Sequence, residues 1–118
     1  MIFATLNESN TRGELMLLDG GMCHWHLRRD GQLTIREIIV APGRQGQGIG
    51  RTMIAILAAT PGTTSIFAKC PATLPANGWY ARVGFTPEGM ETTRSGNTLN
   101  LWRLKLSTAP TATADSRR

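Results

Sequence analysis

A turn rich in glycine is the segment of this sequence whose residue types best suit ligand binding. It joins a β-branched run to an amphipathic segment and reads Val40-Ala41-Pro42-Gly43-Arg44-Gln45-Gly46-Gln47-Gly48-Ile49-Gly50-Arg51. The turn contains no carboxylate. Glycine lets backbone N–H groups approach a ligand closely, and a helix that begins after the turn adds the positive end of its dipole. The pattern therefore predicts a site for a phosphate or a pyrophosphate.

The charge distribution also favours an anionic ligand. The chain has a formal net charge of +5 at pH 7 and a sequence pI near 10.2, which favours an anionic partner. Between Ile38 and Pro87 the sequence has no Asp or Glu. The basic residues of that stretch are Arg44, Arg51, Lys69 and Arg82. The alternative interpretation is a chance gap in a small protein.

Histidines and cysteines are the other residues with metal or redox chemistry. His24 and His26 fall on one face of a predicted strand, a geometry that can bind a metal ion. No third ligand has a suitable spacing, and Cys23 points to the opposite face. We therefore expect surface or cleft packing, with a substrate-facing role as the alternative, and no metal. Cys23 and Cys70 are too few for a disulfide framework, which favours reduced thiols and a cytoplasmic protein.

The composition is that of one globular domain. With 118 residues, 41% of them hydrophobic and 18% charged, the chain can form one core but not two. No apolar run approaches the roughly 18 residues that a membrane span needs, so no membrane role is expected. We expect the domain to occupy residues 1–106. Residues 107–118 are small, polar and aperiodic, which predicts a disordered tail.

Hydrophobic periodicity and turn residues predict the elements that position the glycine turn. In the N-terminal half these are a short strand at residues 2–6 and a weak helix at 8–18. Two strands follow at 22–29 and 32–40, and then a helix at 49–60. Asp30-Gly31 is a hairpin signal between the two strands, and Pro61-Gly62 ends the last helix. Alternation in the second strand of the hairpin predicts one face made of Leu33, Ile35, Glu37 and Ile39.

The C-terminal half is predicted to contain a strand, a short helix and a hairpin. The strand occupies residues 65–69 and the helix 77–83. The hairpin has its turn at 95–97 and its return strand at 99–106. Asn77 is the expected N-cap of the helix. A change of apolar phase near Leu101-Trp102 predicts a bulge there. The chain is thus expected to be an α+β domain with a largely antiparallel sheet and two helices.

Three classes of glycine-rich turn could account for residues 40–51. A Walker A loop needs Lys and then Ser or Thr after its last glycine, but Gly48 is followed by Ile49-Gly50. A Rossmann fingerprint needs G-x-G-x-x-G and an acidic residue about 20 positions later. The spacing here is G-x-G-x-G, and no carboxylate follows until Glu88. Neither of these two classes fits.

The third class fits. Gln45-Gly46-Gln47-Gly48-Ile49-Gly50 matches the [Gln/Arg]-x-x-Gly-x-[Gly/Ala] signature of the Gcn5-related N-acetyltransferases, the GNAT superfamily. Glu37-Ile38-Ile39-Val40-Ala41-Pro42 resembles the strand before that loop. Asn77-Gly78-Trp79-Tyr80-Ala81-Arg82-Val83-Gly84-Phe85 resembles the family's later Asn…Tyr-x-x-x-Gly-Phe motif. The resemblance covers roughly residues 22–106.

The resemblance implies acetyl-CoA as cosubstrate and a mixed, mostly antiparallel sheet whose central strands splay apart between flanking helices. In this family the N–H groups of the loop hold the pyrophosphate, and the pantetheine arm pairs with the exposed backbone of the splayed strands. Here those strands would end at Val40 and near Cys70. The implied cofactor residues are Ile39, Val40, Gln45, Gly46, Gln47, Gly48, Gly50, Arg51 and Asn77.

The resemblance also implies direct acyl transfer to an amine. The amine must be neutral to attack a thioester, so a general base takes its proton, directly or through a water. Glu37 matches the family's acidic strand position; its alternative is an exposed carboxylate paired with Arg36 or Arg28. Tyr80 matches the general acid that protonates the departing thiolate; its alternative is a core aromatic residue with a satisfied hydroxyl. Cys70 is expected to be a packed or cofactor-flanking thiol and not a nucleophile.

The acceptor is less constrained. GNAT domains typically have about two helices between their first strands, whereas only some 21 residues precede the first confident strand here, so this helical region is shortened. The shortening leaves the acceptor site open, which suits a large acceptor or a site completed by the second subunit of a homodimer. Such compact forms resemble small phage-encoded acetyltransferases. Three hypotheses follow: an N-acetyltransferase acting on a protein or a small amine, a DNA-base-modifying enzyme of the phage Mom type, and a non-catalytic domain that binds CoA or nucleic acid.

Overall fold

The computed structural model describes residues 14–106. The predicted strand at 2–6, the start of the predicted helix at 8–18 with the shortened helical region, and the predicted tail at 107–118 lie outside the described residues. The end of that helix prediction is wrong, because Leu15–Leu18 forms strand β1. A short apolar run fits either a helix or a strand, and antiparallel pairing with the next strand decides for the strand.

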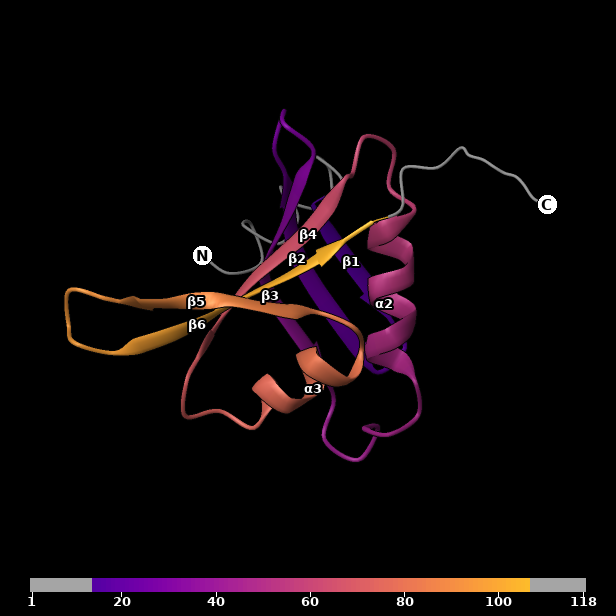
Figure 1. The fold of residues 1–118 in the computed structure, drawn as a ribbon. Helices are drawn as coiled ribbons and strands as arrows, with labels where there is room; N and C mark the ends of the chain where they lie inside the picture. The colour runs from indigo at the N-terminus through magenta and orange to yellow at the C-terminus, as the bar shows by residue number, and fades with distance from the viewer. Residues whose placement is uncertain (1–13, 107–118) are drawn as a thin grey trace, which may run out of the picture.

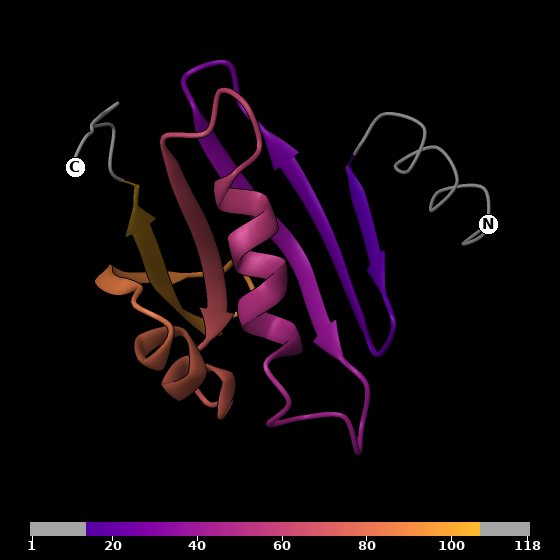
Figure 2. The ribbon, with the colours of Figure 1, turned by 90° about the vertical axis from the view of Figure 1, so that its right-hand side faces the viewer.

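Within the described residues, six strands form one mixed sheet that carries two helices (Figure 1). In chain order the elements are β1 (Leu15–Leu18), β2 (Gly21–Leu27), β3 (Gln32–Val40), α2 (Ile49–Ala58), β4 (Ser65–Pro71), α3 (Ala76–Arg82), β5 (Thr86–Thr92) and β6 (Thr98–Lys105). The sheet order is β1-β2-β3-β4-β6-β5, and only the β3–β4 pair is parallel. α2 connects these two strands across one face of the sheet (Figure 2). The predicted α+β fold is confirmed.

A bulge in β3 divides the face that simple alternation predicts. The β2–β3 hairpin and the bounds of β3 agree with the sequence analysis. However, His24 pairs with Glu37 while Trp25 pairs with Ile35, so Arg36 is an extra residue between the two pairs. The prediction of one common face is therefore wrong. Leu33 and Ile35 are buried, whereas Glu37 and Ile39 are exposed.

β3 and β4 separate toward their carboxyl ends. They pair only over Gln32–Ile35 and Ser65–Ala68. Beyond these residues β3 follows β2 as far as Val40, and β4 follows β6 as far as Pro71. Figure 2 shows the two strands diverging beside α2. The predicted splay of the central strands is confirmed, and it leaves backbone groups that face the gap without a partner strand.

α2 anchors the glycine turn to the sheet. The helix predicted at 49–60 is present at Ile49–Ala58. Its fully buried residues, Met53 and Leu57, join Leu33 and Ile66 in the core, and burial of each such side chain contributes about 2 kcal/mol. The helical spacing of the apolar residues in this segment also predicts a buried Ile56, but its side chain is 43% exposed. No helix in residues 14–106 is both long enough and apolar enough to cross a membrane.

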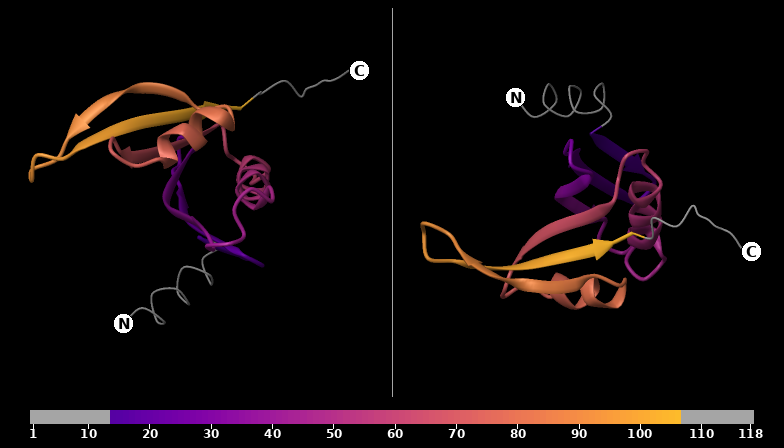
Figure 3. Two further views of the ribbon diagram at one scale, coloured as in Figure 1. Left: turned by 90° about the horizontal axis from the view of Figure 1, so that it is seen from below. Right: turned by 45° about the horizontal axis from the view of Figure 1, so that its top comes forward.

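Two details of the C-terminal half correct the sequence analysis. The N-cap of α3 is Pro75 and not Asn77, whose side chain bonds elsewhere. The last bulge lies in β5, between Pro87 and Gly89, opposite Leu101-Trp102 and not within that pair. The β5–β6 hairpin itself is confirmed, and it extends beyond the rest of the sheet (Figure 3).

Candidate functional site

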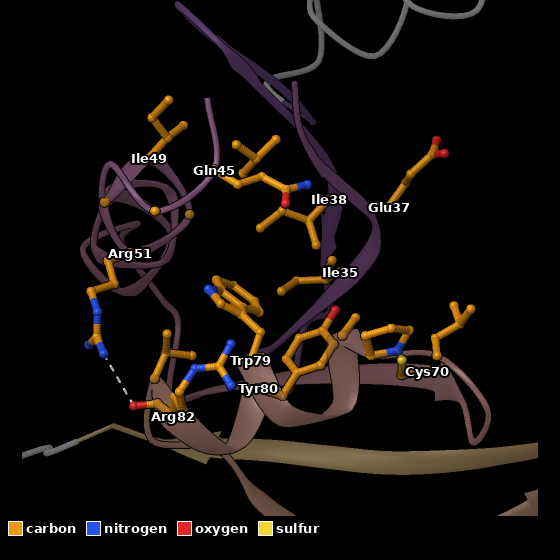
Figure 4. Close-up of a pocket in the computed structure, with 18 of the residues that line it drawn as sticks. Ile35, Glu37, Ile38, Gln45, Ile49, Arg51, Cys70, Trp79, Tyr80 and Arg82 are labelled. Carbon is orange, nitrogen blue, oxygen red and sulfur yellow. Dashed lines mark hydrogen bonds between the residues drawn. The ribbon is translucent and has the colours of Figure 1, made fainter. Parts of the chain in front are cut away.

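A cavity of about 840 Å³ opens where β3 and β4 separate. Its walls are the ends of these strands, the glycine turn with the first turn of α2, and α3 (Figure 4). Its volume is in the range of sites for small molecules and cofactors. The cavity is lined by all four basic residues of the carboxylate-free stretch, Arg44, Arg51, Lys69 and Arg82. Residues that are far apart in the sequence thus bring positive charge to one space.

Three glycines of the turn are required by the backbone and not by packing. Gly43, Gly46 and Gly48 have φ values of 84°, 80° and 83°, in the left-handed region that favours glycine. A Cβ added at any of them would meet nothing within 4 Å. Gly48 is the N-cap of α2. No side chain among residues 14–106 caps this helix, and its first turn has no acidic residue. The first N–H groups of α2 therefore need an acceptor that a bound anion can supply.

Gly50 has a different role from the other glycines. It is buried, and an added Cβ would lie 2.6 Å from Cζ2 of Trp79. The indole of Trp79 on α3 therefore packs directly against the first turn of α2, where a larger residue would collide with it. This contact sets the spacing between the two helices that flank the cavity.

The ring of Tyr80 is buried while its hydroxyl faces the cavity. The residue is 5% exposed; its ring makes edge contacts with Trp79 and Phe85, with centroids 5.1 and 5.2 Å apart, and stacks on Trp102 at 6.2 Å. The hydroxyl points into the cavity (Figure 4), and no residue among 14–106 forms a hydrogen bond with it. Burial raises the pKa of Tyr80 to about 12, so the phenol keeps its proton at neutral pH.

Cys70 lies at the same end of the cavity as a neutral thiol. It is 3% exposed, and its Sγ donates a weak hydrogen bond to the carbonyl of Pro71 at 3.6 Å. Burial raises the pKa of the Cys70 thiol, and burial raises that of Cys23 to about 12. A thiol that holds its proton is a poor nucleophile, which agrees with the expected packing role.

Glu37 lies at the rim of the cavity and points away from it. Its carboxylate is exposed and lies on the face of the sheet opposite the helices, because the bulge at Arg36 turns it outward (Figure 4). Tyr80 approaches from the helix side. The expected general base and the expected general acid therefore lie on opposite sides of the gap between β3 and β4.

Most of the predicted site residues gather around the cavity. Those that line it are Glu37, Val40, Gln45, Gly46, Gly48, Gly50, Arg51 and Tyr80. Those that do not are Ile39, Gln47 and Asn77. The side chain of Ile39 is 44% exposed, and Gln47 accepts a hydrogen bond from Nε of Arg44 at 3.0 Å.

Asn77 is engaged by the protein itself. Its Nδ2 donates to the carbonyls of Pro71 and Leu74 at 2.9 and 2.8 Å. Its Oδ1 accepts from Nδ2 of Asn100 at 3.0 Å and from Nε1 of Trp102 at 2.9 Å. Trp102 in turn stacks on Tyr80, so Asn77 holds the residue that supports the Tyr80 ring.

Several cavity residues were missing from the predicted site, and Arg82 and Trp79 are the two that matter most for its shape and charge. Arg82 belongs to the carboxylate-free stretch, so the charge pattern contained a signal for it. Trp79 could not be found in this way, because its position in the site depends on its contact with Gly50 across two helices.

Of the two histidines, His26 forms part of a surface cluster. Nδ1 of His26 lies 2.9 Å from Oε2 of Glu14, and Arg36 lies 3.7 Å from the other oxygen of that carboxylate. Among residues 14–106, no group of three or more His, Cys, Asp or Glu could hold a metal ion.

The family model and the solved structures agree with each other. A family model described as an acetyltransferase (GNAT) domain matches residues 6–87, more than half of the chain. A search of the curated proteins finds no match. A solved structure assigned to the GNAT family of acetyltransferases, from Desulfovibrio desulfuricans, is 25% identical with a TM-score of 0.65. The match covers 73% of this chain and 61% of that one, so this chain spans less than two thirds of that relative.

Two further structures share the fold. A protein assigned as an acetyltransferase from Agrobacterium tumefaciens is 21% identical with a TM-score of 0.64, and the match covers 87% of this chain and 85% of that one. RimL, a ribosomal L7/L12 alpha-N-protein acetyltransferase in complex with coenzyme A, is 18% identical with a TM-score of 0.67, over 87% and 68% of the two chains.

Proposed function

The chain belongs to the GNAT acetyltransferase family, and on this premise we propose that it transfers an acetyl group from acetyl-CoA directly to a primary amine. The observation that carries the proposal is the cavity. It joins in one space an uncapped helix N-terminus with three left-handed glycines and the unpartnered hydroxyl of Tyr80. The helix N-terminus with its glycines fits a diphosphate, and the Tyr80 hydroxyl fits a leaving group that needs a proton.

The donor would be held mainly by backbone. N–H groups of Gln45, Gly46, Gly48 and Arg51 at the turn are the proposed diphosphate ligands. The free edge of β3 near Val40 supplies N–H and C=O groups for an amide-bearing arm. Ile39 would contribute through its backbone, since its side chain faces outward, and Gln47 would orient Arg44. Acetyl-CoA supplies the thioester that the amine attacks.

Tyr80 is the proposed general acid. Its hydroxyl is protonated at neutral pH, has no protein acceptor among the described residues and is fixed in direction by three aromatic neighbours. A donor with these properties can give its proton to a departing thiolate without first breaking another hydrogen bond.

Glu37 is the proposed general base. It lies beyond the last β3–β4 pair, exposed on the outer face of the sheet. An amine that reaches the gap from this face meets the carboxylate first, which takes its proton directly or through a water. Glu37 would then take the proton of the amine on one side of the thioester carbonyl, and Tyr80 would give a proton to the departing thiolate on the other.

The acceptor class that we propose is an amine on a protein. The outer face around Glu37 is exposed among the described residues, so it places no narrow pocket around the acceptor. RimL, whose fold is similar, is described as an acetyltransferase of a protein α-amino group. A small amine remains an outcome of the test.

Release of the CoA thiol from acetyl-CoA tests the proposal. The purified protein is incubated with acetyl-CoA and, separately, a peptide with a free N-terminus, a peptide with a lysine, a small polyamine and duplex DNA. We expect thiol release that depends on an amine, with a mass increase of one acetyl group on a peptide. CoA binding without turnover on any amine would contradict the proposal, and modification of the DNA would support a base-modifying enzyme instead.

A further inference from the structure

Two arginines at one end of the cavity have no carboxylate partner among residues 14–106. Arg51 belongs to the first turn of α2 and Arg82 is the last residue of α3. Nη2 of Arg51 donates a hydrogen bond to the backbone carbonyl of Arg82 at 3.3 Å, and Figure 4 shows the Arg51 side chain extending from α2 toward α3. Both residues are exposed and line the cavity.

The other basic residues that line the cavity are neutralised by the protein. Their carboxylate partners are Glu14 for Arg36, Asp19 for Arg44 and Glu91 for Lys69, at 3.7, 3.3 and 3.1 Å. The charges of Arg51 and Arg82 are the ones on the cavity wall that the described residues leave uncompensated. The hydrogen bond from Arg51 to the Arg82 carbonyl makes these two residues neighbours at the cavity. Two neighbouring arginines without a carboxylate can supply the charge and the N–H donors that bind a dianion such as a phosphate monoester.

The diphosphate does not need this pair. The glycine turn already offers an uncapped helix N-terminus, and the hydrogen bond to Arg82 draws the Arg51 guanidinium toward α3 and away from the turn. Coenzyme A carries a third phosphate, on the 3′ oxygen of its ribose, which lies on the far side of the diphosphate from the thiol. In Figure 4 Arg51 lies on one side of the cavity and Tyr80 toward the other, so a phosphate beyond the diphosphate would lie on the side of Arg51.

We propose that Arg51 and Arg82 bind the 3′-phosphate of coenzyme A and so select it over dephospho-CoA. This inference rests on the proposed function, because it assumes that the cavity holds the coenzyme. Arg82 is the more informative residue, since its side chain makes no contribution to the glycine turn. Charge-assisted hydrogen bonds from a guanidinium to a phosphate make a loss of about 10-fold in affinity the expected effect.

Calorimetric titration with two probes, CoA and dephospho-CoA, tests the proposal on the full chain. Wild-type protein should bind CoA about 10-fold more tightly than dephospho-CoA. Arg82→Gln should weaken CoA about 10-fold and leave dephospho-CoA nearly unchanged, so that the preference is lost. Arg94→Gln removes the same charge from the exposed β5–β6 turn and should change neither affinity.

The outcomes are distinct. An equal loss for both ligands in Arg82→Gln would overturn the inference, because the arginine would then hold the shared diphosphate. An unchanged preference would overturn it as well, and Arg51→Gln provides a second variant with the same expectation. Failure of wild-type protein to bind either ligand would instead overturn the coenzyme site itself and this inference with it. A normal melting temperature for each variant confirms that folding is intact.

Discussion

The wall formed by β3, the glycine turn and α2 offers a ligand mostly backbone, whereas the wall formed by β4 and α3 offers side chains. On the first wall, Gly43, Gly46 and Gly48 have open space beside them. On the second, the aromatic residues of α3 make dense contacts with one another and with Trp102. The difference is consistent with the proposed roles, in which backbone groups bind the diphosphate and side chains act at the reacting end of the donor.

The two walls should therefore fail in different ways. A backbone wall depends on the conformation of a few glycines and tolerates changes in the side chains around them. A side-chain wall depends on the groups behind it, because a reacting atom has to be held to within a fraction of an ångström. Substitutions in the two walls can test this difference. The largest loss of stability is expected for the residue that supports the aromatic side chains of the second wall.

Asn77→Ala should lower the free energy of unfolding by about 3 kcal/mol, because it leaves several hydrogen-bonding groups without a partner. Those groups include the indole N–H of Trp102 and the carbonyl of Pro71. Urea denaturation measures the loss. Asn97→Ala, in the exposed β5–β6 turn, is the matched control and should cost well under about 1 kcal/mol. Equal losses in the two variants would show that Asn77 does not support α3.

Gly50→Ala should cost about 2 kcal/mol of stability, because the new methyl group collides with the indole of Trp79. The collision is steric, so Gly50→Ala combined with Trp79→Leu should be more stable than Gly50→Ala alone. Gly48→Ala meets no atom within 4 Å and should cost only about 1 kcal/mol of backbone strain. Thermal melts compare the three variants, and the contact between the helices is disproved if Gly48→Ala is the more damaging single change.

Tyr80→Phe should lower kcat by about 10-fold or more, because it removes the proton donor from the side-chain wall. The ring and its three aromatic contacts are kept, so the affinity for CoA should change little. Amine-dependent thiol release gives kcat, and calorimetry gives the affinity. Turnover close to that of wild-type protein would remove Tyr80 from the mechanism.

Glu37→Gln should lower the rate by about 10-fold at neutral pH, with recovery as the pH rises and more of the amine is neutral without help. The recovery distinguishes a lost base from a lost structural contact, which would not respond to the ionisation of the amine. Asp30→Asn removes an exposed carboxylate at the opposite end of the β2–β3 hairpin and should leave the rate unchanged. A deficit that is constant over pH would contradict the role of Glu37.

The sequence was sufficient for the parts of the site that are encoded locally. The glycine turn, the bounds of β3 and the position of α2 follow from residue types and periodicity, and the Tyr80 motif indicated a residue that does face the cavity. The basic residues of the carboxylate-free stretch were also identifiable as a group, although only the fold brings them together.

What could not be predicted depends on contacts between distant segments. The bulge at Arg36 arises from the register between two strands, and it reversed the expected orientation of Glu37 and Ile39. Asn77 has the residue type of a helix cap, but its partners on β6 are about twenty residues away and outcompete the capping position. Local propensity indicates the element in such cases, while tertiary hydrogen bonds decide what the side chain does.

The smallest expected effect is the pH dependence of stability, which comes from two buried acidic groups. Burial raises the pKa of Cys23, on the sheet beneath α2, from 9.0 to about 12, and that of Tyr80 from 10.0 to about 12. Both groups favour the neutral form in the folded protein, so their stabilisation is complete below about pH 9 and is lost as the pH rises toward 12.

Between pH 8 and pH 10 the free energy of unfolding should fall by about 1 kcal/mol, mostly because the Cys23 thiol ionises first in the unfolded chain. Urea denaturation at the two pH values measures the change. Cys23→Ala should be less stable at both but should lose much less between them, whereas Tyr80→Phe should keep most of the loss in this range. A wild-type stability that is constant from pH 8 to pH 10 would mean that the sheet beneath α2 does not exclude water from this thiol.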